Sequence, residues 1–275
     1  MKNPSKIFDL HEQGLTPSEI AELTGLNRKS VVIMLNRKGL FVNRHTKIEF
    51  PNELIQFIRG SILGDGCIPF KKGRQCHIIS FGHCVKQLEY IQWKHDFLKK
   101  YNLVTSKVKP YIQKSDRYIN GECKSYSFTS LTNPIFSEFR KLYYREDKKK
   151  YINREDIIKL DEFGLAIWYM DDGNVWNVNK ERNGSSCITL NTNSFSKDDV
   201  LFLIDFLMNK WNIKSTYNKS DNTIRISVFS CENFIELVRP YIVKCMEYKM
   251  VLYKSDELLG LHHKIGQSAA KINLC

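Results

Sequence analysis

Two apolar runs of helical length organise the hydrophobic pattern of this chain. Residues 58–66 read IRGSILGDG, and residues 165–173 read LAIWYMDDG. Each run suits a buried helix, and each ends in an acidic residue followed by a glycine. We therefore predict two core helices, each stopped by a glycine in the left-handed conformation, at Gly66 and Gly173.

The first run carries two glycines, Gly60 and Gly64, which share one helix face. Small residues on one face let two helix backbones approach closely. If the two predicted helices pack along this face, Asp65 and Asp172 emerge together at one end of the seam. Two carboxylates at short range repel each other unless a divalent cation neutralises them, and hard oxygen ligands favour magnesium. The alternative is two ordinary buried helices with glycine caps.

The order of elements repeats after 107 residues, which is the spacing between Asp65 and Asp172. In each copy, we expect the acidic-ended helix to be followed by two strands, a long amphipathic helix, two further strands and a closing helix. This pattern predicts an α+β protein with two pseudo-symmetric αββαββα halves, at residues 46–150 and 151–275. The predicted segments are 67–72, 76–83, 86–101, 105–114, 124–129 and 134–144 in the first half, and 174–180, 186–193, 196–211, 213–219, 223–229 and 232–241 in the second.

Residues 1–45 have the pattern of a separate all-α domain with three short helices. Ala21 precedes Gly25 with the spacing of a helix-turn-helix, in which the alanine lets two helices cross closely and the glycine permits the turn. Asn27 is suited to cap the third helix, which we expect to face a DNA major groove. A plain helical bundle with a solvated basic face would have the same pattern. The predicted DNA contacts of this domain are Asn27, Arg28, Lys29 and Asn36.

Polar and apolar side chains alternate in the predicted strands 105–114 and 223–229. Period-two patterning places one row in a core, which includes Pro110 and Ile112 in the first strand and Val228 in the second. The other row, of basic, amide and hydroxyl side chains, can contact phosphates and base edges, although any half-buried sheet has a polar outer row. The residues predicted to contact DNA from the two sheets are Lys107, Lys109, Gln113, Asn177, Asn191 and Arg225.

The charge of the chain favours a polyanionic partner. The 42 Lys plus Arg against 30 Asp plus Glu give a formal net charge of +12, which attracts nucleic acid or an anionic membrane. No apolar run approaches a membrane span and the first residues have no secretory pattern, so we expect an intracellular protein that binds double-stranded DNA. A cluster of Cys67, Cys76, His77, His83 and Cys84 could hold zinc, but these positions are more typical of strands in a reduced protein.

At its two apolar runs the chain resembles the LAGLIDADG homing endonucleases, in particular the branch whose second motif reads LAIWYMDDG. The resemblance implies a monomer whose two sheets form a saddle on a long, asymmetric DNA site. It implies that Asp65 and Asp172 hold magnesium, with manganese as a substitute, and that metal-activated water cuts both strands to leave 3′ overhangs. Ile167 departs from the pattern, because it stands where the family consensus has a glycine.

Two lysines complete the site that this resemblance implies. In this branch, a lysine that follows the last helix of each half lies beside the metals, where it can stabilise developing charge or polarise the attacking water. Lys150 and Lys249 occupy these places, although Lys149 is a rival of Lys150. The backbone carbonyls of Gly64 and Asp171 are weaker candidates as metal ligands.

Four other functions fit parts of this pattern. A transcription regulator with a degenerate LAGLIDADG domain would lack the acidic pair, which is intact here. A maturase that binds intron RNA shares the fold, and a nickase would need one disabled site. An intein-embedded endonuclease is disfavoured by the initial Met and by the lack of a His-Asn pair before Cys275. We therefore interpret the chain as a free-standing DNA endonuclease.

Overall fold

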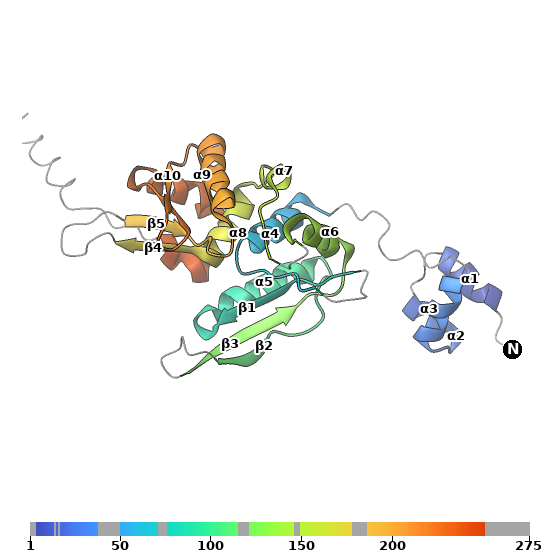
Figure 1. Cartoon of the computed structure of the whole chain (residues 1–275). Helices are drawn as coiled ribbons and strands as arrows, with labels where there is room; N and C mark the ends of the chain where they lie inside the picture. Colours follow the sequence, from blue (N-terminus) through green and yellow to red (C-terminus); the bar gives the residue numbers. More distant parts are fainter. Residues whose placement is uncertain are drawn as a thin grey trace, which may run out of the picture. The chain divides into compact units, whose positions relative to one another are not determined.

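The computed structural model describes residues 4–13, 15, 17–37, 50–70, 76–114, 121–145, 149–177 and 186–250, without the side chains of residues 4, 36, 37, 113, 176 and 177. The chain divides into two compact units, whose boundary in the sequence lies between Glu49 and Phe50. The larger unit contains both apolar runs and two antiparallel sheets (Figure 1). The predicted α+β class is therefore confirmed.

The N-terminal unit contains three helices within the described residues. They are α1 (Pro4–Glu12), α2 (Pro17–Thr24) and α3 (Arg28–Arg37), and their small core is formed by Ile7, Ile20, Val31 and Leu35. Gly25, between α2 and α3, has a φ of +64°, which is the left-handed conformation that glycine adopts without strain. The side-chain oxygen of Asn27 accepts the backbone N–H of Lys29 at 2.8 Å. The predicted turn and the predicted cap therefore both form.

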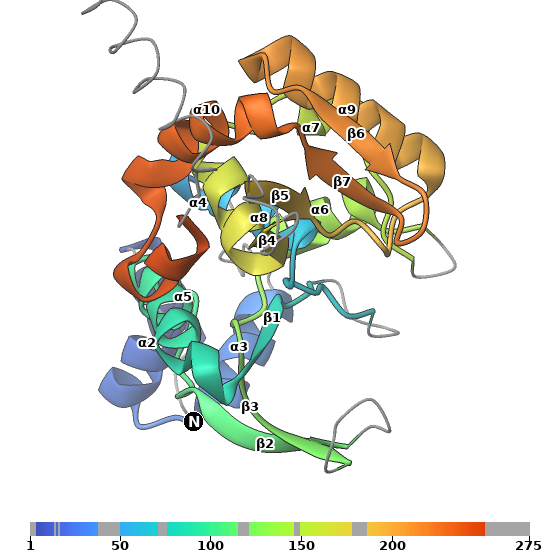
Figure 2. The same ribbon diagram turned by 90° about the vertical axis from the view of Figure 1, so that its left-hand side faces the viewer.

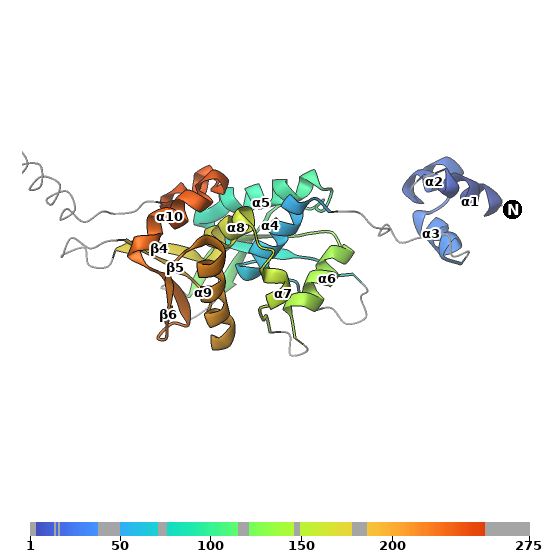
Figure 3. The same ribbon diagram turned by 90° about the horizontal axis from the view of Figure 1, so that it is seen from above.

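Helices α4 (Asn52–Leu63) and α8 (Glu162–Asp172) lie side by side at the centre of the larger unit (Figures 1 and 3). A Cβ atom on Gly60 would lie 2.2 Å from the carbonyl oxygen of Gly164, so the two backbones touch at this point. Gly60 therefore faces the seam, as predicted. On α8 the close approach is made by Gly164, which precedes the apolar run, and Ile167 does not prevent it.

The two glycines after the acidic residues do not adopt the left-handed conformation, so this prediction is wrong. Gly173 has φ −80° and ψ 150° and begins a strand, and Gly66 is not among the described glycines with positive φ. Both positions need glycine because they lack space for a side chain. A Cβ on Gly66 would lie 2.6 Å from the Ser61 carbonyl oxygen, and one on Gly173 would lie 2.0 Å from the Tyr169 ring.

The first half contains one antiparallel sheet, in which the described strands have the order β1-β3-β2. Its elements are β1 (Ser80–Cys84), the 3-10 helix η1 (Val85–Gln87), α5 (Leu88–Lys100), β2 (Lys109–Lys114), β3 (Glu122–Thr129) and α6 (Pro134–Tyr143). Helix α5 packs against β1 and β3. The predicted strand 67–72 is wrong where it is described, because Cys67 forms only an isolated bridge with Ser80; residues 71 and 72 lie outside the described part.

The second half has all four predicted strands, in the order β4-β5-β7-β6 within the described residues. Its elements are β4 (Gly173–Asn177), β5 (Ser186–Leu190), α9 (Lys197–Trp211), β6 (Ser215–Asn218), β7 (Thr223–Ile226), α10 (Val228–Val238) and the 3-10 helices η2 (Arg239–Tyr241) and η3 (Lys244–Met250). The predicted strand 223–229 is too long, because α10 begins at Val228. Val228 is 42% exposed, so it does not join the core row.

The two sheets extend away from the paired helices, with β2 and β3 on one side and β6 and β7 on the other (Figure 2). The outer end of β2 differs from the prediction. Pro110 and Ile112 were expected in the core row, yet both are exposed, and Ile112 is 59% exposed. The reason is that β2 is an edge strand, and α5 makes its sheet contacts with β1 and β3. Side chains on both faces of β2 are therefore exposed to solvent.

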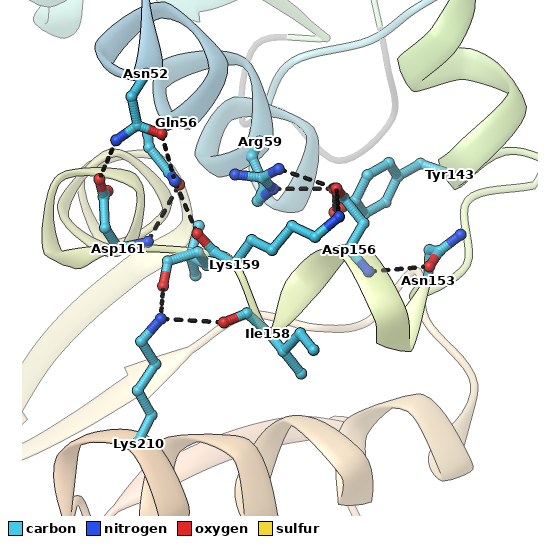
Figure 4. Close-up of polar contacts among 11 residues, drawn as sticks. Asn52, Gln56, Arg59, Tyr143, Asn153, Asp156, Ile158, Lys159, Asp161 and Lys210 are labelled. Atoms are coloured by element: carbon cyan, nitrogen blue, oxygen red, sulfur yellow. Dashed lines mark hydrogen bonds and ion pairs between the residues drawn. The ribbon is translucent and has the colours of Figure 1, made fainter.

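Polar contacts hold the connection between the two halves (Figure 4). Arg59 on α4 donates from Nε and Nη2 to the two carboxylate oxygens of Asp156 in α7 (Arg154–Ile157), each at 2.9 Å. The Tyr143 hydroxyl, at the end of α6, donates to the same carboxylate at 2.7 Å. Arg59 and Asp156 are both buried. We call Arg59, Tyr143 and Asp156 the linker clasp.

The chain after the linker clasp is also bound to helices of both halves. Gln56 on α4 donates to the Lys159 carbonyl at 2.7 Å and accepts the Asp161 N–H at 3.1 Å. Lys210 on α9 donates to the carbonyls of Ile158 and Leu160 (Figure 4). The linker is thus part of the packed structure.

Candidate active site

The two acidic residues of the motifs lie near each other at the ends of α4 and α8. Burial raises the pKa of both carboxyls, to about 6 for Asp65 and about 7 for Asp172. The neighbouring charge of Asp171 adds to the shift at Asp65, and the charge of Asp65 adds to the shift at Asp172. Repulsion among Asp65, Asp171 and Asp172 is the effect expected of carboxylates that share a site.

The two helix ends are not equivalent. Helix α8 includes Asp172, whereas α4 ends at Leu63, so Asp65 lies beyond the helix. The Asp65 side chain is 37% exposed. Its backbone N–H is accepted by the Asp171 carboxylate at 3.2 Å. A side-chain contact from α8 thus holds the backbone of Asp65.

Each of the two predicted lysines binds backbone carbonyls at one helix end. Lys150 Nζ donates to the Gly64 carbonyl at 2.9 Å, and Lys249 Nζ donates to the Met170 carbonyl at 2.6 Å, with the Asp171 carbonyl at 3.4 Å. Burial lowers the pKa of both lysines, while the nearby aspartates oppose this shift. Cations suit helix C-termini, so these lysines also cap α4 and α8. The carbonyls of Gly64 and Asp171, which we considered as metal ligands, accept hydrogen bonds from lysines here.

The side chain of Asp171 enters a buried polar cluster that the sequence did not predict. Its Oδ1 accepts from Lys94 Nζ at 2.5 Å and from the Tyr90 hydroxyl at 2.7 Å. Lys94 and Tyr90 are both fully buried on α5. The sequence does contain a signal, because Lys94 interrupts the apolar stripe of an amphipathic helix, and a lysine on a buried face needs a partner.

His83 on β1 also lies at the site. Its Nδ1 is 3.5 Å from Asp65 Oδ2 and 3.1 Å from Gln87 Oε1. Burial, with a contribution from Lys94, lowers the pKa of His83 to about 4, so the ring is neutral at neutral pH. Within the described residues, the Cys and His positions considered for zinc do not form a metal-binding group. The group whose ligand atoms lie within 4.8 Å of one another is instead Asp65, His83 and Asp171.

Strand register places polar residues in a row across the second sheet. Asn174 pairs with Thr189, Thr189 with Arg225, and Arg225 with Thr216, so one side chain from each strand contributes. Asn174 was missing from the predicted DNA contacts. Asn191 is exposed just after β5, and its N–H donates to the Asp172 carbonyl at 3.0 Å.

The other predicted DNA contacts can be placed as follows. Lys109 lies on β2 opposite Ser127, and Lys107 is exposed before the strand begins. Arg28 and Lys29 are exposed in the N-terminal unit, and Arg225 is partly buried. The side chains of Asn36, Gln113 and Asn177 lie outside the described part.

The larger unit thus has two helices paired at a glycine seam, acidic residues at their ends and two antiparallel sheets beside them, which is the arrangement that the resemblance implied. The family model described as the LAGLIDADG DNA endonuclease family matches residues 55–234. The chain therefore belongs to the LAGLIDADG DNA endonuclease family, as its motifs predicted. No helix among the described residues is long and apolar enough to cross a membrane.

Individual proteins are also similar to this chain. The chain is 30% identical to Protein RecA of Mycolicibacterium flavescens over 210 residues, which cover 73% of this chain and 47% of that protein. It is 28% identical to the cytochrome b mRNA maturase bI2 of Debaryomyces hansenii over 205 residues, covering 73% of this chain and 74% of that protein. The chain spans about half the length of the RecA relatives that it matches.

One solved structure is similar over most of the chain. It is the homing endonuclease I-WcaI bound to its DNA recognition sequence, with 27% identity and a TM-score of 0.66. The similarity covers 84% of this chain and 96% of that one.

Proposed function

We propose that this protein is a site-specific homing endonuclease that makes a magnesium-dependent double-strand break in a long, asymmetric DNA site and leaves 3′ overhangs. The observation that carries the proposal is the placement of the carboxylates of Asp65 and Asp172 at the ends of two helices packed along a glycine seam, where burial and neighbouring carboxylates raise the pKa of both. The similarity to I-WcaI, which was solved on its DNA recognition sequence, supports a duplex DNA substrate.

The residues at the helix ends fit a divalent metal. Their donors are carboxylate oxygens, which suit magnesium and manganese. Burial and the neighbouring carboxylates raise the pKa of both acids even with Lys150 and Lys249 nearby, and a bound cation would favour their charged forms. Asp65 and Asp172 would hold the metal. When bound, it would lower the pKa of a water molecule and offset charge on the phosphate.

The protein side chains around the acids have separate tasks. Lys150 and Lys249 place one cation near each helix end, where a cation can stabilise the charge that develops on a phosphate under attack. His83 also lies beside Asp65, but its ring is neutral and so adds no charge to the site. Two contacts favour Lys150 over Lys149 for this task. Lys150 donates to the Gly64 carbonyl, and the charges of Asp65 and Asp172 both act to raise its pKa.

The two sheets would supply binding to the duplex. The row Asn174, Thr189, Arg225 and Thr216 offers amide, hydroxyl and guanidinium groups to phosphates and base edges. Lys109 is its counterpart on the first sheet, and Lys107 adds charge before that strand. Because such contacts release counterions, affinity should fall steeply as salt rises.

Cleavage of a plasmid library tests the proposal, with and without magnesium. We expect the parent to make defined double-strand breaks with 3′ overhangs, and Asp65→Asn with Asp172→Asn to bind the same sites without cutting. The matched control is Asp161→Asn, at the opposite end of α8, which should cut as the parent does. Tight binding without any cleavage by the parent would exclude the endonuclease function.

The N-terminal unit would act as a helix-turn-helix that extends the DNA footprint, with Arg28 and Lys29 at the exposed start of α3. The competing role is repression of a promoter. Removal of residues 1–49 should weaken binding to the cleavage site and reduce the dependence of affinity on salt. Unchanged affinity for the cleavage site would favour the repressor role.

Assistance to intron splicing is a second candidate function. It is favoured by the similarity to a cytochrome b mRNA maturase over 73% of this chain. Filter binding with intron RNA and with duplex DNA separates the two, because a maturase should bind its intron tightly in the absence of cleavable DNA. The two activities are not exclusive.

A further inference from the structure

The unequal ends of α4 and α8 raise the question of what holds Asp65 in place. Asp172 is the last residue of α8, so helical geometry places it. Asp65 lies beyond the end of α4, in a turn closed by hydrogen bonds from the Gly64 N–H to the Gly60 carbonyl at 3.1 Å and from the Gly66 N–H to the Ser61 carbonyl at 2.7 Å. The hydrogen bond that joins this turn to α8 runs from the Asp65 N–H to the Asp171 carboxylate. The position of Asp65 relative to α8, and so to Asp172, therefore depends on the Asp171 side chain.

The Asp171 side chain is in turn held by two side chains of α5. Lys94 Nζ and the Tyr90 hydroxyl both donate to Oδ1, while Oδ2 accepts from Asp65. The carboxylate also lies against the backbone of Gly64, where a Cβ atom would be 2.8 Å from Oδ2. This arrangement leaves Asp171 little freedom, since its charge is compensated by a lysine that has no exposed surface.

Among the described residues, the second half has no equivalent of this cluster. Helices α5 and α9 are both followed by a left-handed asparagine, Asn102 and Asn212, each with a φ of 54°. Counting back equally from these residues, Lys94 corresponds to Ile204, and Tyr90 corresponds to Val200. Along the motifs, Asp171 corresponds to Gly64. The cluster therefore occurs at one of the two acids only.

We propose that Asp171, Lys94 and Tyr90 are positioning residues that hold Asp65 in register with Asp172, and that the two strand cuts therefore depend on them unequally. The proposal rests on the proposed endonuclease function. The competing explanation is a buried ion pair that merely stabilises the fold. A pair of that kind can be replaced by apolar residues of similar volume with little loss of stability. Such a replacement separates the two explanations.

Two combined variants make the comparison. The first, Tyr90→Phe with Lys94→Met and Asp171→Leu, makes the cluster apolar like its second-half counterpart and removes the acceptor for the Asp65 N–H. The second, Lys94→Met with Asp171→Asn, removes both charges but keeps a side-chain oxygen in the same place. Ile204→Met is the matched control on α9. None of these leaves a buried charge without its partner.

The measurement is the rate of cleavage of each strand in a duplex labelled on both strands. In the apolar variant we expect the ratio of the two rates to change by about tenfold or more relative to the parent, because small misplacements of reacting groups cost this much. The Asn variant and Ile204→Met should keep the parental ratio within about threefold. A parental ratio in the apolar variant, or equal loss on both strands, overturns the proposal.

Hydrogen exchange of the Asp65 amide in metal-free protein is the second readout, and it does not need cleavage. The apolar variant should exchange this amide faster than the parent, and the Asn variant should protect it. If the parent cuts no DNA, the proposed function fails, and exchange alone decides whether the cluster positions Asp65. If the apolar variant does not fold, both measurements are made on Tyr90→Phe alone. We then expect a smaller change in the ratio of the two cleavage rates. An unchanged ratio would count against the proposal.

Discussion

The two halves share an order of elements but differ in what their interiors contain. Beneath its sheet, the second half is packed with apolar residues such as Leu203, Phe234 and Ile226. The first half buries Arg59 and Lys94 among its apolar side chains. At the matching places the second half has Ala166, one motif period after Arg59, and Ile204.

Arg59 and Lys94 bind carboxylates that come later in the chain, whereas a third buried cation of the first half, Arg140, donates to the Ile68 carbonyl. Arg59 binds Asp156 in the linker, and Lys94 binds Asp171 at the end of α8. A buried ion pair adds little net stability, because desolvation offsets most of the attraction, but breaking one is costly. Apolar packing therefore forms each half. The two ion pairs in addition restrict where the first half lies relative to the linker and to α8.

Removal of one member of the linker clasp should have the largest effect on stability. Arg59→Ala leaves the Asp156 carboxylate buried without its cation, so we expect the free energy of unfolding to fall by about 3–5 kcal/mol. Arg59→Met combined with Asp156→Leu should recover most of this loss. Chemical denaturation measures both. A loss below about 1 kcal/mol for the single variant would show that the clasp does not hold the linker.

The two lysines allow a comparison of the two helix ends in activity. Lys150→Met and Lys249→Met should each slow cleavage by about a hundredfold, since each removes a cation near a reacting phosphate. Strand-resolved cleavage assays would show whether each lysine serves a different strand. Lys149→Met is the control and should cut at the parental rate. Similar losses in Lys149→Met would contradict the assignment of Lys150.

The glycine seam should be more sensitive than glycines elsewhere. Gly60→Ala places a Cβ atom against the Gly164 backbone, which cannot move away easily, so we expect a loss of about 1–3 kcal/mol in the free energy of unfolding. Gly82→Ala is the control, because its Cβ would meet the mobile end of Tyr111 at 3.0 Å. Thermal melting compares the two. Equal shifts in Tm would mean that the backbones at the seam can separate at little cost.

Acid should weaken the linker clasp gradually, and this is the smallest effect. Although burial raises the pKa of Asp156, hydrogen bonds from Arg59 and Tyr143 outweigh it and hold that pKa below its ordinary value. The stability from this pair is complete above the unfolded pKa of about 3.9 and is lost as pH falls through the lower folded pKa. Relative to Arg59→Met with Asp156→Leu, the parent should therefore lose stability only below about pH 4. A difference that already shrinks between pH 7 and 5 would contradict this.

The sequence predicts the parts of this molecule that depend on local pattern. The motif helices, the cap at Asn27 and the later strands follow from periodicity and spacing, and Gly60 marks the seam correctly. Parts that depend on distant neighbours were missed or wrong. Glycine is needed at Gly66 because the Ser61 carbonyl leaves no space for a side chain, and not because of a left-handed turn. Ile112 is exposed because its strand lies at a sheet edge.

The same distinction applies within the site. The proximity of Asp65 and Asp172 was predictable because the motifs repeat. The pairing of Lys94 with Asp171 was not, since the two residues lie 77 positions apart and no motif connects them. A lysine on the apolar face of α5 signals that a partner exists, but only the folded structure identifies it.

The bound linker has a consequence for chimeras of this protein. If a flexible linker joined the two halves, either half could be exchanged for that of a relative with the junction anywhere in the linker. Here the donor of the first half must keep Gln56, Arg59 and Tyr143, and the segment from Asp156 to Asp161 must travel with them. A junction that keeps these contacts therefore lies after this segment, at the start of α8, and the donor of the second half must then keep Gly164 and Asp171.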